Sequence, residues 1–86
     1  MERNTIFEKI IELIDNCDYV GLLIKLEQIT EKSDLVKDVG FDSLDKIELI
    51  MSVEQEYKIT IDVDEELKIC NISDLIDIII LKKWTP

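Results

Sequence analysis

The stretch DVGFDSLDKIEL, residues 38–49, places Ser43 between a glycine-containing turn and the start of an amphipathic helix. A nucleophilic serine needs a general base, usually histidine, and the sequence contains no histidine. A serine–lysine pair would require Lys46, which we expect on a solvated helix surface. Catalysis by paired carboxylates needs a cleft, which a thin bundle of 86 residues rarely provides. We therefore predict that this chain has no catalytic residue.

Two interpretations of Ser43 follow from its position. In the first, it is an ordinary serine at a helix start that contributes one hydrogen bond, as the tripeptide Asp-Ser-Leu by itself favours. In the second, Ser43 is the substrate of another enzyme, because the free N–H groups and partial positive charge of a helix N-terminus suit a phosphate ester. The residues themselves leave both interpretations open.

The charge of the chain limits its partners. Twenty acidic residues against ten basic ones give a net charge of −10, which argues against nucleic acid and against anionic membrane surfaces. It favours partners that present Lys and Arg, with association steered by charge and weakened by salt. The longest apolar run, residues 78–81, is far too short to span a bilayer, and the charged N-terminus does not resemble a signal peptide. We expect a cytoplasmic monomer.

The two cysteines, Cys17 and Cys70, lie far apart in the sequence and form no Cys-x-x-Cys pair. Without histidine they cannot complete a mixed metal site, so we predict no bound metal. The residues favour two small packed side chains in a reducing compartment, and they do not exclude a disulfide.

Hydrophobic periodicity predicts four helices in one domain, residues 1–86, forming an all-α, four-helix bundle with three main helices and one short helix. Thr5 and Glu8 form a candidate capping box for the first helix, and we predict Asp42 and Asn71 as N-caps further along the chain. The segment KITID lacks a strand partner. The predicted helices span residues 6–15, 43–57, 63–69 and 72–83.

The stretch between the first two helices is the least readable part of the chain. Its apolar residues, from Leu22 to Ile29, fit a short helix or an extended packed loop equally well. Ser33 and Asp34 predict a turn, and three apolar residues after it are candidates for anchoring the loop to the core: Leu35, Val36 and Val39.

The helix after Ser43 carries two apolar stripes at about 100° per residue. One contains Leu49, Ile50, Val53 and Tyr57, and the other, about 140° away, contains Leu44, Ile47 and Met51. Either both stripes are core, as in central helices of small bundles, or the second is an exposed docking strip with acidic borders. Residues 42–66 hold nine acids and two bases, which favours the exposed strip.

These residues resemble the acyl carrier protein family over residues 36–80. The family pattern is a glycine, any residue, then Asp-Ser-Leu-Asp opening a helix, followed by an acidic short helix and an apolar last helix. The matching positions are Gly40, Asp42, Ser43, Leu44, Asp45, Glu48, Leu49, Met51, Glu54, Tyr57, Ile61, Asp64, Glu65, Lys68, Ile69 and Ile76.

The resemblance implies a carrier rather than an enzyme. Ser43 would receive 4′-phosphopantetheine from coenzyme A through a separate phosphopantetheinyl transferase, with Asp42 and Leu44 beside it in the cofactor site. The thiol of this arm would hold acyl groups as thioesters for acyl-loading, condensing and processing enzymes that present basic patches. The docking residues that the resemblance implies are Leu44, Asp45, Ile47, Glu48, Met51 and Glu54.

The chain also departs from the family pattern, most clearly in its first loop. The apolar segment YVGLLIKL replaces a more polar loop, Phe41 stands where a smaller residue is common, and Cys70 stands where threonine is common. The pathway is therefore open among fatty-acid, polyketide and related synthesis. Two alternatives are an aminoacyl carrier of the peptidyl or D-alanyl kind and an unmodified helical adaptor of the same fold.

Overall fold

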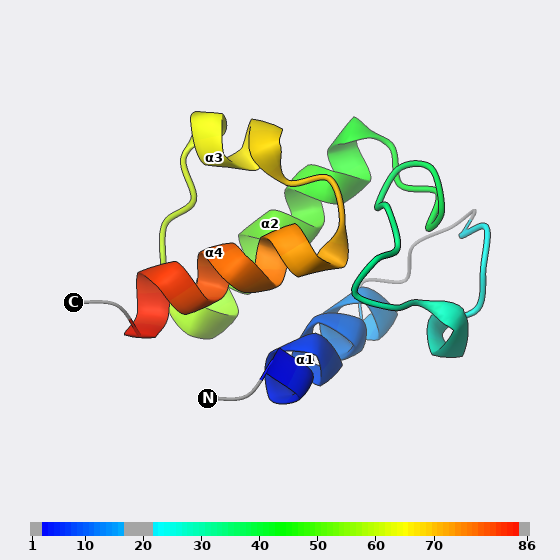
Figure 1. Ribbon diagram of the computed structural model, residues 1–86. Helices are drawn as coiled ribbons and strands as arrows, with labels where there is room; N and C mark the ends of the chain where they lie inside the picture. Colours follow the sequence, from blue (N-terminus) through cyan, green and yellow to red (C-terminus); the bar gives the residue numbers. More distant parts are fainter. Residues whose placement is uncertain (1–2, 17–21, 85–86) are drawn as a thin grey trace.

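The computed structural model describes residues 3–16 and 22–84, and these residues form four α-helices and no strand. The helices are α1 (Arg3–Asn16), α2 (Ser43–Tyr57), the short α3 (Val63–Lys68) and α4 (Ile72–Trp84). Helix α1 packs against both α2 and α4, and α3 lies on the opposite side of these two helices (Figure 1). The predicted bundle of three main helices and one short helix is confirmed.

Reciprocal caps explain where three of these helices begin. The Asp45 N–H donates to the Asp42 side chain at 2.9 Å, and the Asp42 N–H donates to the Asp45 side chain at 3.2 Å. Each pair satisfies backbone donors that a helix start would otherwise leave without a partner. The same arrangement opens the next two helices, through Asp62 with Glu65 and through Asn71 with Asp74. The predicted caps Asp42 and Asn71 are thus confirmed.

The start of α1 differs from the prediction. The helix already includes Arg3, so Thr5 lies inside its first turns and the predicted Thr5–Glu8 capping box is wrong. The Arg3 guanidinium donates to Glu31 at 2.8 Å and to Asp77 at 2.6 Å. These partners come from the long loop and from α4, so contacts distant in sequence hold the first turn of α1 against the rest of the bundle.

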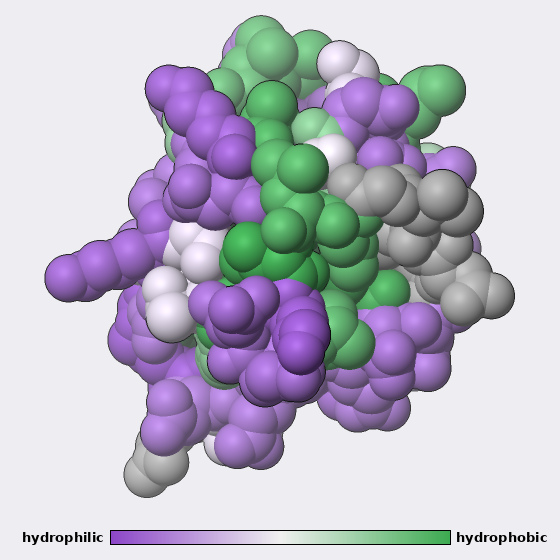
Figure 2. Space-filling model, turned by 90° about the vertical axis from the view of Figure 1, so that its right-hand side faces the viewer, coloured by the Kyte–Doolittle hydropathy of each residue, from purple (hydrophilic) through white to green (hydrophobic). Residues whose placement is uncertain are grey.

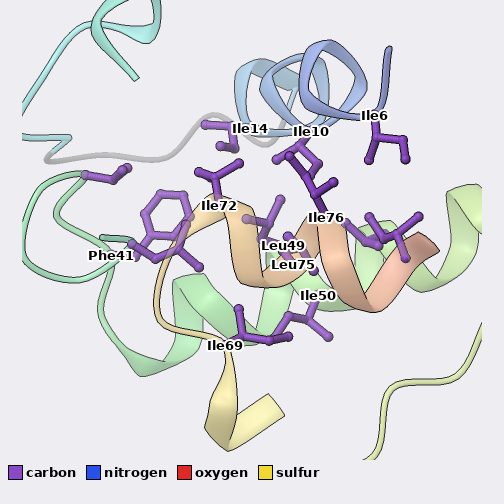
Figure 3. Close-up of a cluster of buried hydrophobic side chains, with 14 of the residues drawn as sticks. Ile6, Ile10, Ile14, Phe41, Leu49, Ile50, Ile69, Ile72, Leu75 and Ile76 are labelled. Carbon is purple, nitrogen blue, oxygen red and sulfur yellow. The ribbon is translucent and has the colours of Figure 1, made fainter. Parts of the chain in front are cut away.

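The core is a cluster of branched aliphatic side chains and one phenylalanine. Side chains from α1, α2 and α4 meet in it, and Phe41 and Ile69 close it from the adjoining segments (Figure 3). Of the four residues in the first predicted stripe, Leu49, Ile50 and Val53 are buried and Tyr57 is half-buried. Burial of one face of each helix supplies the main stabilising free energy of a small bundle.

The loop of residues 22–41 is extended and packed, with a single 3-10 turn at Leu26–Gln28. It is bonded to the chain between α3 and α4: the Leu35 N–H donates to the Cys70 carbonyl at 2.9 Å, and the Ser73 N–H donates to the Glu31 carbonyl at 2.8 Å. Leu35 is buried as predicted. The other two predicted anchors differ in exposure: Val39 is buried, whereas Val36 is 53% exposed. The prediction for Val36 is therefore wrong.

The remaining boundaries match closely. Helix α3 ends at Lys68 instead of residue 69, and α4 continues one residue further to Trp84. The segment KITID forms no strand. None of the described helices is both long and apolar enough to cross a membrane. Residues 3–16 and 22–84 contain no group of three or more His, Cys, Asp or Glu side chains that could hold a metal ion, and Cys17 lies outside them.

Candidate functional site

Ser43 is the first residue of α2 and its side chain is exposed. Gly40, with φ of 96°, turns the chain in a conformation that favours glycine. The next residue, Phe41, is 2% exposed and anchors this turn in the core. Asp42 then caps the helix. A buried anchor, a glycine turn and a cap therefore hold the Ser43 hydroxyl at the surface.

The surroundings of Ser43 suit an attached phosphate better than they suit catalysis. The first N–H groups of α2 have no acceptor within the helix, and the helix dipole adds partial positive charge there. Such a helix start accommodates a phosphate group. The sequence has no histidine to act as a base for the hydroxyl. Phosphate chemistry on Ser43 would thus require a base from another protein.

Lys46 lies one turn after Ser43 and is half-buried, not on the fully solvated surface that we predicted. Its ammonium group is one of two positive charges that act on the carboxyl of Asp34 in the loop. Backbone N–H groups of Lys37 and Val36 lower the pKa of the Asp34 carboxyl, and the positive charges of Lys37 and Lys46 lower it further. The positive charges of Lys37 and Lys46 therefore both act on the Asp34 carboxyl.

The second apolar stripe of α2 is exposed. Leu44 is 69% exposed, Met51 52% and Ile47 38%, although Leu49 on the other side of the helix is fully buried. The alternative that both stripes are core is thus excluded for these three residues. The strip begins directly beside Ser43, so the structure brings together the predicted attachment residue and the predicted docking side chains.

The three acids predicted to border this strip have different environments. The side chain of Glu48 is exposed, while the Asp45 carboxylate is bonded to the Asp42 N–H in the helix cap. The Glu54 carboxylate accepts a hydrogen bond from the Ile61 N–H at 2.9 Å and so ties α2 to the segment before α3. Glu54 therefore has a structural contact that its sequence position did not indicate.

Several exposed apolar residues near the site were not predicted as site residues. Val63 and Leu67 on α3 are 69% and 72% exposed, and Leu23 on the loop is 66% exposed. The four-residue spacing of Val63 and Leu67 was a signal for a common helix face, but it could not show whether that face was buried. Leu23 and Val36 gave no signal, because an irregular loop has no period that separates inside from outside.

A surface hollow of about 310 Å³ lies between α3 and α4, and no residue predicted for the site lines it. Glu65 at its edge bonds Lys82 at 2.8 Å, and this bond lowers the pKa of the Glu65 carboxyl. The lining residues are Glu65, Lys68, Asp74, Asp77, Ile78 and Leu81.

Comparisons with known proteins agree with this geometry. Residues 9–79 match a family model described as a phosphopantetheine attachment site. The chain is 34% identical over 79 residues to the acyl carrier protein of Coprothermobacter proteolyticus, covering 92% of each chain. It is 39% identical over 70 residues to that of Nitratidesulfovibrio vulgaris, covering 81% of this chain and 87% of the relative.

Among solved structures, the acyl carrier protein from Enterococcus faecalis superposes with a TM-score of 0.73. The superposition covers 95% of this chain and 99% of that one, at 23% identity. At that identity the likeness concerns the fold alone, and it agrees with the arrangement of helices described above.

Proposed function

The chain belongs to the acyl carrier protein family and has that family's phosphopantetheine attachment domain, and we propose that it is a discrete carrier modified on Ser43. The observation that carries this proposal is the exposed Ser43 hydroxyl at the capped start of α2, directly beside an exposed apolar strip. The residues around Ser43 fit the group, because a helix N-terminus and a nearby lysine both favour its phosphate. The attached arm supplies a terminal thiol that holds acyl groups as thioesters.

In the proposed modification, Ser43 Oγ attacks the phosphorus of coenzyme A that carries the pantetheine portion. A new phosphorus–oxygen bond forms as the pyrophosphate bond breaks, and adenosine 3′,5′-bisphosphate leaves. The hydroxyl proton passes to a base of a phosphopantetheinyl transferase, because this chain has no histidine. The role of the chain is to expose Ser43 and to favour the negative charge of the product at the start of α2.

The proposed docking surface for the transferase and the acyl-processing enzymes is the strip formed by Leu44, Ile47 and Met51, with Glu48 and Asp45 at its edge. Apolar contact at the centre of such a surface supplies affinity, and charge at the rim mainly sets the association rate. Residues 42–66 contribute −7 of the net charge of −10, so partners with basic patches are favoured.

The direct test is modification of the purified chain. We expect incubation with coenzyme A and a broad-specificity phosphopantetheinyl transferase to add one phosphopantetheine group, measured by intact mass. The Ser43→Ala variant should gain nothing, and the matched control Ser52→Ala on the same helix should be modified normally. No adduct on the parent chain, or an adduct on Ser43→Ala, would refute the proposal.

Cargo is a separate question for the same protein. We propose acyl cargo for fatty-acid, polyketide or related synthases, because the strongly acidic surface after Ser43 disfavours a peptidyl carrier. Loading the modified chain with acyl donors and, in parallel, with aminoacyl donors such as D-alanyl would separate these classes. Protein from its native cell that lacks the adduct but retains a partner would instead indicate an unmodified adaptor.

A further inference from the structure

The two sides of Ser43 differ in charge. On one side, residues 42–66 of α2, α3 and the link between them carry nine acids and, apart from Lys46, a single base, Lys58. On the other, the loop of residues 22–41 carries four acids and three lysines, a net charge of −1. A negatively charged group attached to Ser43 therefore meets less repulsion on the loop side.

A positive charge also lies close to Ser43 in the sequence, at Lys46. Ser43 and Lys46 are three residues apart on α2, a spacing that places two side chains on neighbouring turns of the same surface. The Lys46 ammonium lies within electrostatic reach of Asp34, as does that of Lys37, and Asp34 belongs to the loop. The spacing of Lys46 from Ser43 on α2 allows its ammonium group to meet a phosphate on Ser43, and its charge also acts on Asp34 of the loop.

The loop side also has exposed apolar surface. Val36 is at the exposed part of the turn that is closed by the Val39 N–H donating to the Asp34 carbonyl at 3.0 Å. The Leu23 N–H donates to the Val39 carbonyl at 2.9 Å, which holds Leu23 close to the same turn. Figure 2, which views this side of the molecule, shows a band of hydrophobic surface along its centre with hydrophilic residues beside it. The side chains of Leu23 and Val36 face solvent, although their burial against an apolar group would be favourable.

We propose that the arm attached to Ser43 rests across the loop side of the molecule, with its phosphate beside Lys46 and its apolar cargo on Leu23 and Val36. This inference rests on the proposed function, since it requires modification of Ser43. A group tethered at Ser43 has a high effective concentration at this surface, so weak contacts suffice to hold it there. The apolar strip of α2 and the acids at its edge then stay uncovered and accessible to basic partners while the cargo is attached.

The proposal is tested with a coenzyme A conjugate that bears a nitroxide on its thiol, transferred by the transferase onto the full chain labelled with ¹⁵N. This route leaves both cysteines unchanged, and intact mass confirms one adduct. We expect paramagnetic broadening of the Leu23 and Val36 amide signals to exceed that of Glu48 and Met51. Broadening centred on Glu48 and Met51 would overturn the proposal.

Variants separate the two contacts. Lys46→Gln should reduce the broadening at Leu23 and Val36, while Lys58→Gln, at the other end of α2, should leave it unchanged. An octanoyl group on the thiol of the arm should change the chemical shifts of loop signals relative to the chain that carries the arm alone. The double variant Leu23→Ser, Val36→Ser should abolish this change. Unchanged loop signals in Lys46→Gln would overturn the role of Lys46.

Failure of the two proposals is distinguishable by mass. A chain with no adduct would contradict modification of Ser43 and remove the premise of this inference. A chain with one adduct but no preferential broadening of the loop would leave the carrier function intact and overturn the resting position alone. All three variants alter exposed or half-buried side chains, so we expect the fold to persist.

Discussion

The two apolar sides of α2 are similar in sequence and opposite in role. Leu44 and Leu49 are the same residue type on the same helix, yet Leu44 is 69% exposed and Leu49 is fully buried. The buried side faces α1 and α4 and stabilises the bundle, whereas the exposed side begins beside Ser43 and is bordered by acids. Exposed aliphatic side chains give little stability, so their clustering beside Ser43, the proposed modification residue, is better explained by partner binding than by folding.

The sharpest way to break this comparison is the same substitution on both sides of the helix. Leu49→Ala should lower the free energy of unfolding by about 2–5 kcal/mol, because it removes buried methyl groups and leaves a cavity. Leu44→Ala should change it by less than about 0.5 kcal/mol. Chemical denaturation monitored by circular dichroism measures both. Equal losses of stability would show that the exposed strip is part of the core.

The cap of α2 affects both sides because it sets where the helix begins. Asp42→Ala should lower the free energy of unfolding by about 1 kcal/mol, since the Asp45 N–H loses its acceptor. Asp42→Asn retains a good cap and serves as the control, with a change of only a few tenths of a kcal/mol. A denaturation midpoint equal to that of the parent in Asp42→Ala would contradict the role of this cap.

Two glutamates on α2 test whether acidic residues near the strip share one role. Glu54→Ala should lower the free energy of unfolding by about 1 kcal/mol, because the Ile61 N–H loses a hydrogen-bond partner. Glu48→Ala should leave stability unchanged to within about 0.5 kcal/mol, because Glu48 is exposed. If thermal melts rank the two variants in the reverse order, Glu54 is not the structural member of the pair.

Charge reversal at Glu48 should act on association instead of folding. We expect Glu48→Lys to slow modification by the transferase by roughly fivefold at low salt, with a smaller effect at high salt as screening increases. The rate is measured by intact mass over time. Major unfolding of this variant in a circular dichroism melt would mean that Glu48 is structural.

The smallest expected effect concerns Asp34 on the loop side. Its pKa is lowered in the folded chain, so its charge stabilises the fold at neutral pH, and this contribution is lost as pH falls through the folded pKa. Asp34→Asn keeps an oxygen acceptor but removes the charge. The stability difference between parent and variant should therefore be present at pH 7 and shrink below about the ordinary carboxyl value of 3.8. A difference that grows on acidification would contradict this sign.

Local features were predictable wherever a few neighbouring residues decide the outcome. The starts of α2 and α4, with their caps at Asp42 and Asn71, follow from short-range hydrogen bonding between residues three apart. The start of α1 was missed because Arg3 is held by Asp77 and Glu31, which are distant in sequence. The role of Val36 was missed because a loop residue has no periodicity that reports its exposure.

The sequence by itself determined the helices, the position of Ser43 at a helix start, the acidic surface after it and the resemblance to a carrier family. These depend on residue type, spacing and charge, all of which are local or additive properties. Only the tertiary structure decided that Leu44, Ile47 and Met51 are exposed, that Glu54 bonds the Ile61 N–H, and that Lys46 is half-buried. Those outcomes depend on which segments meet in space, because a helix period shows that two stripes exist but not which one another helix covers.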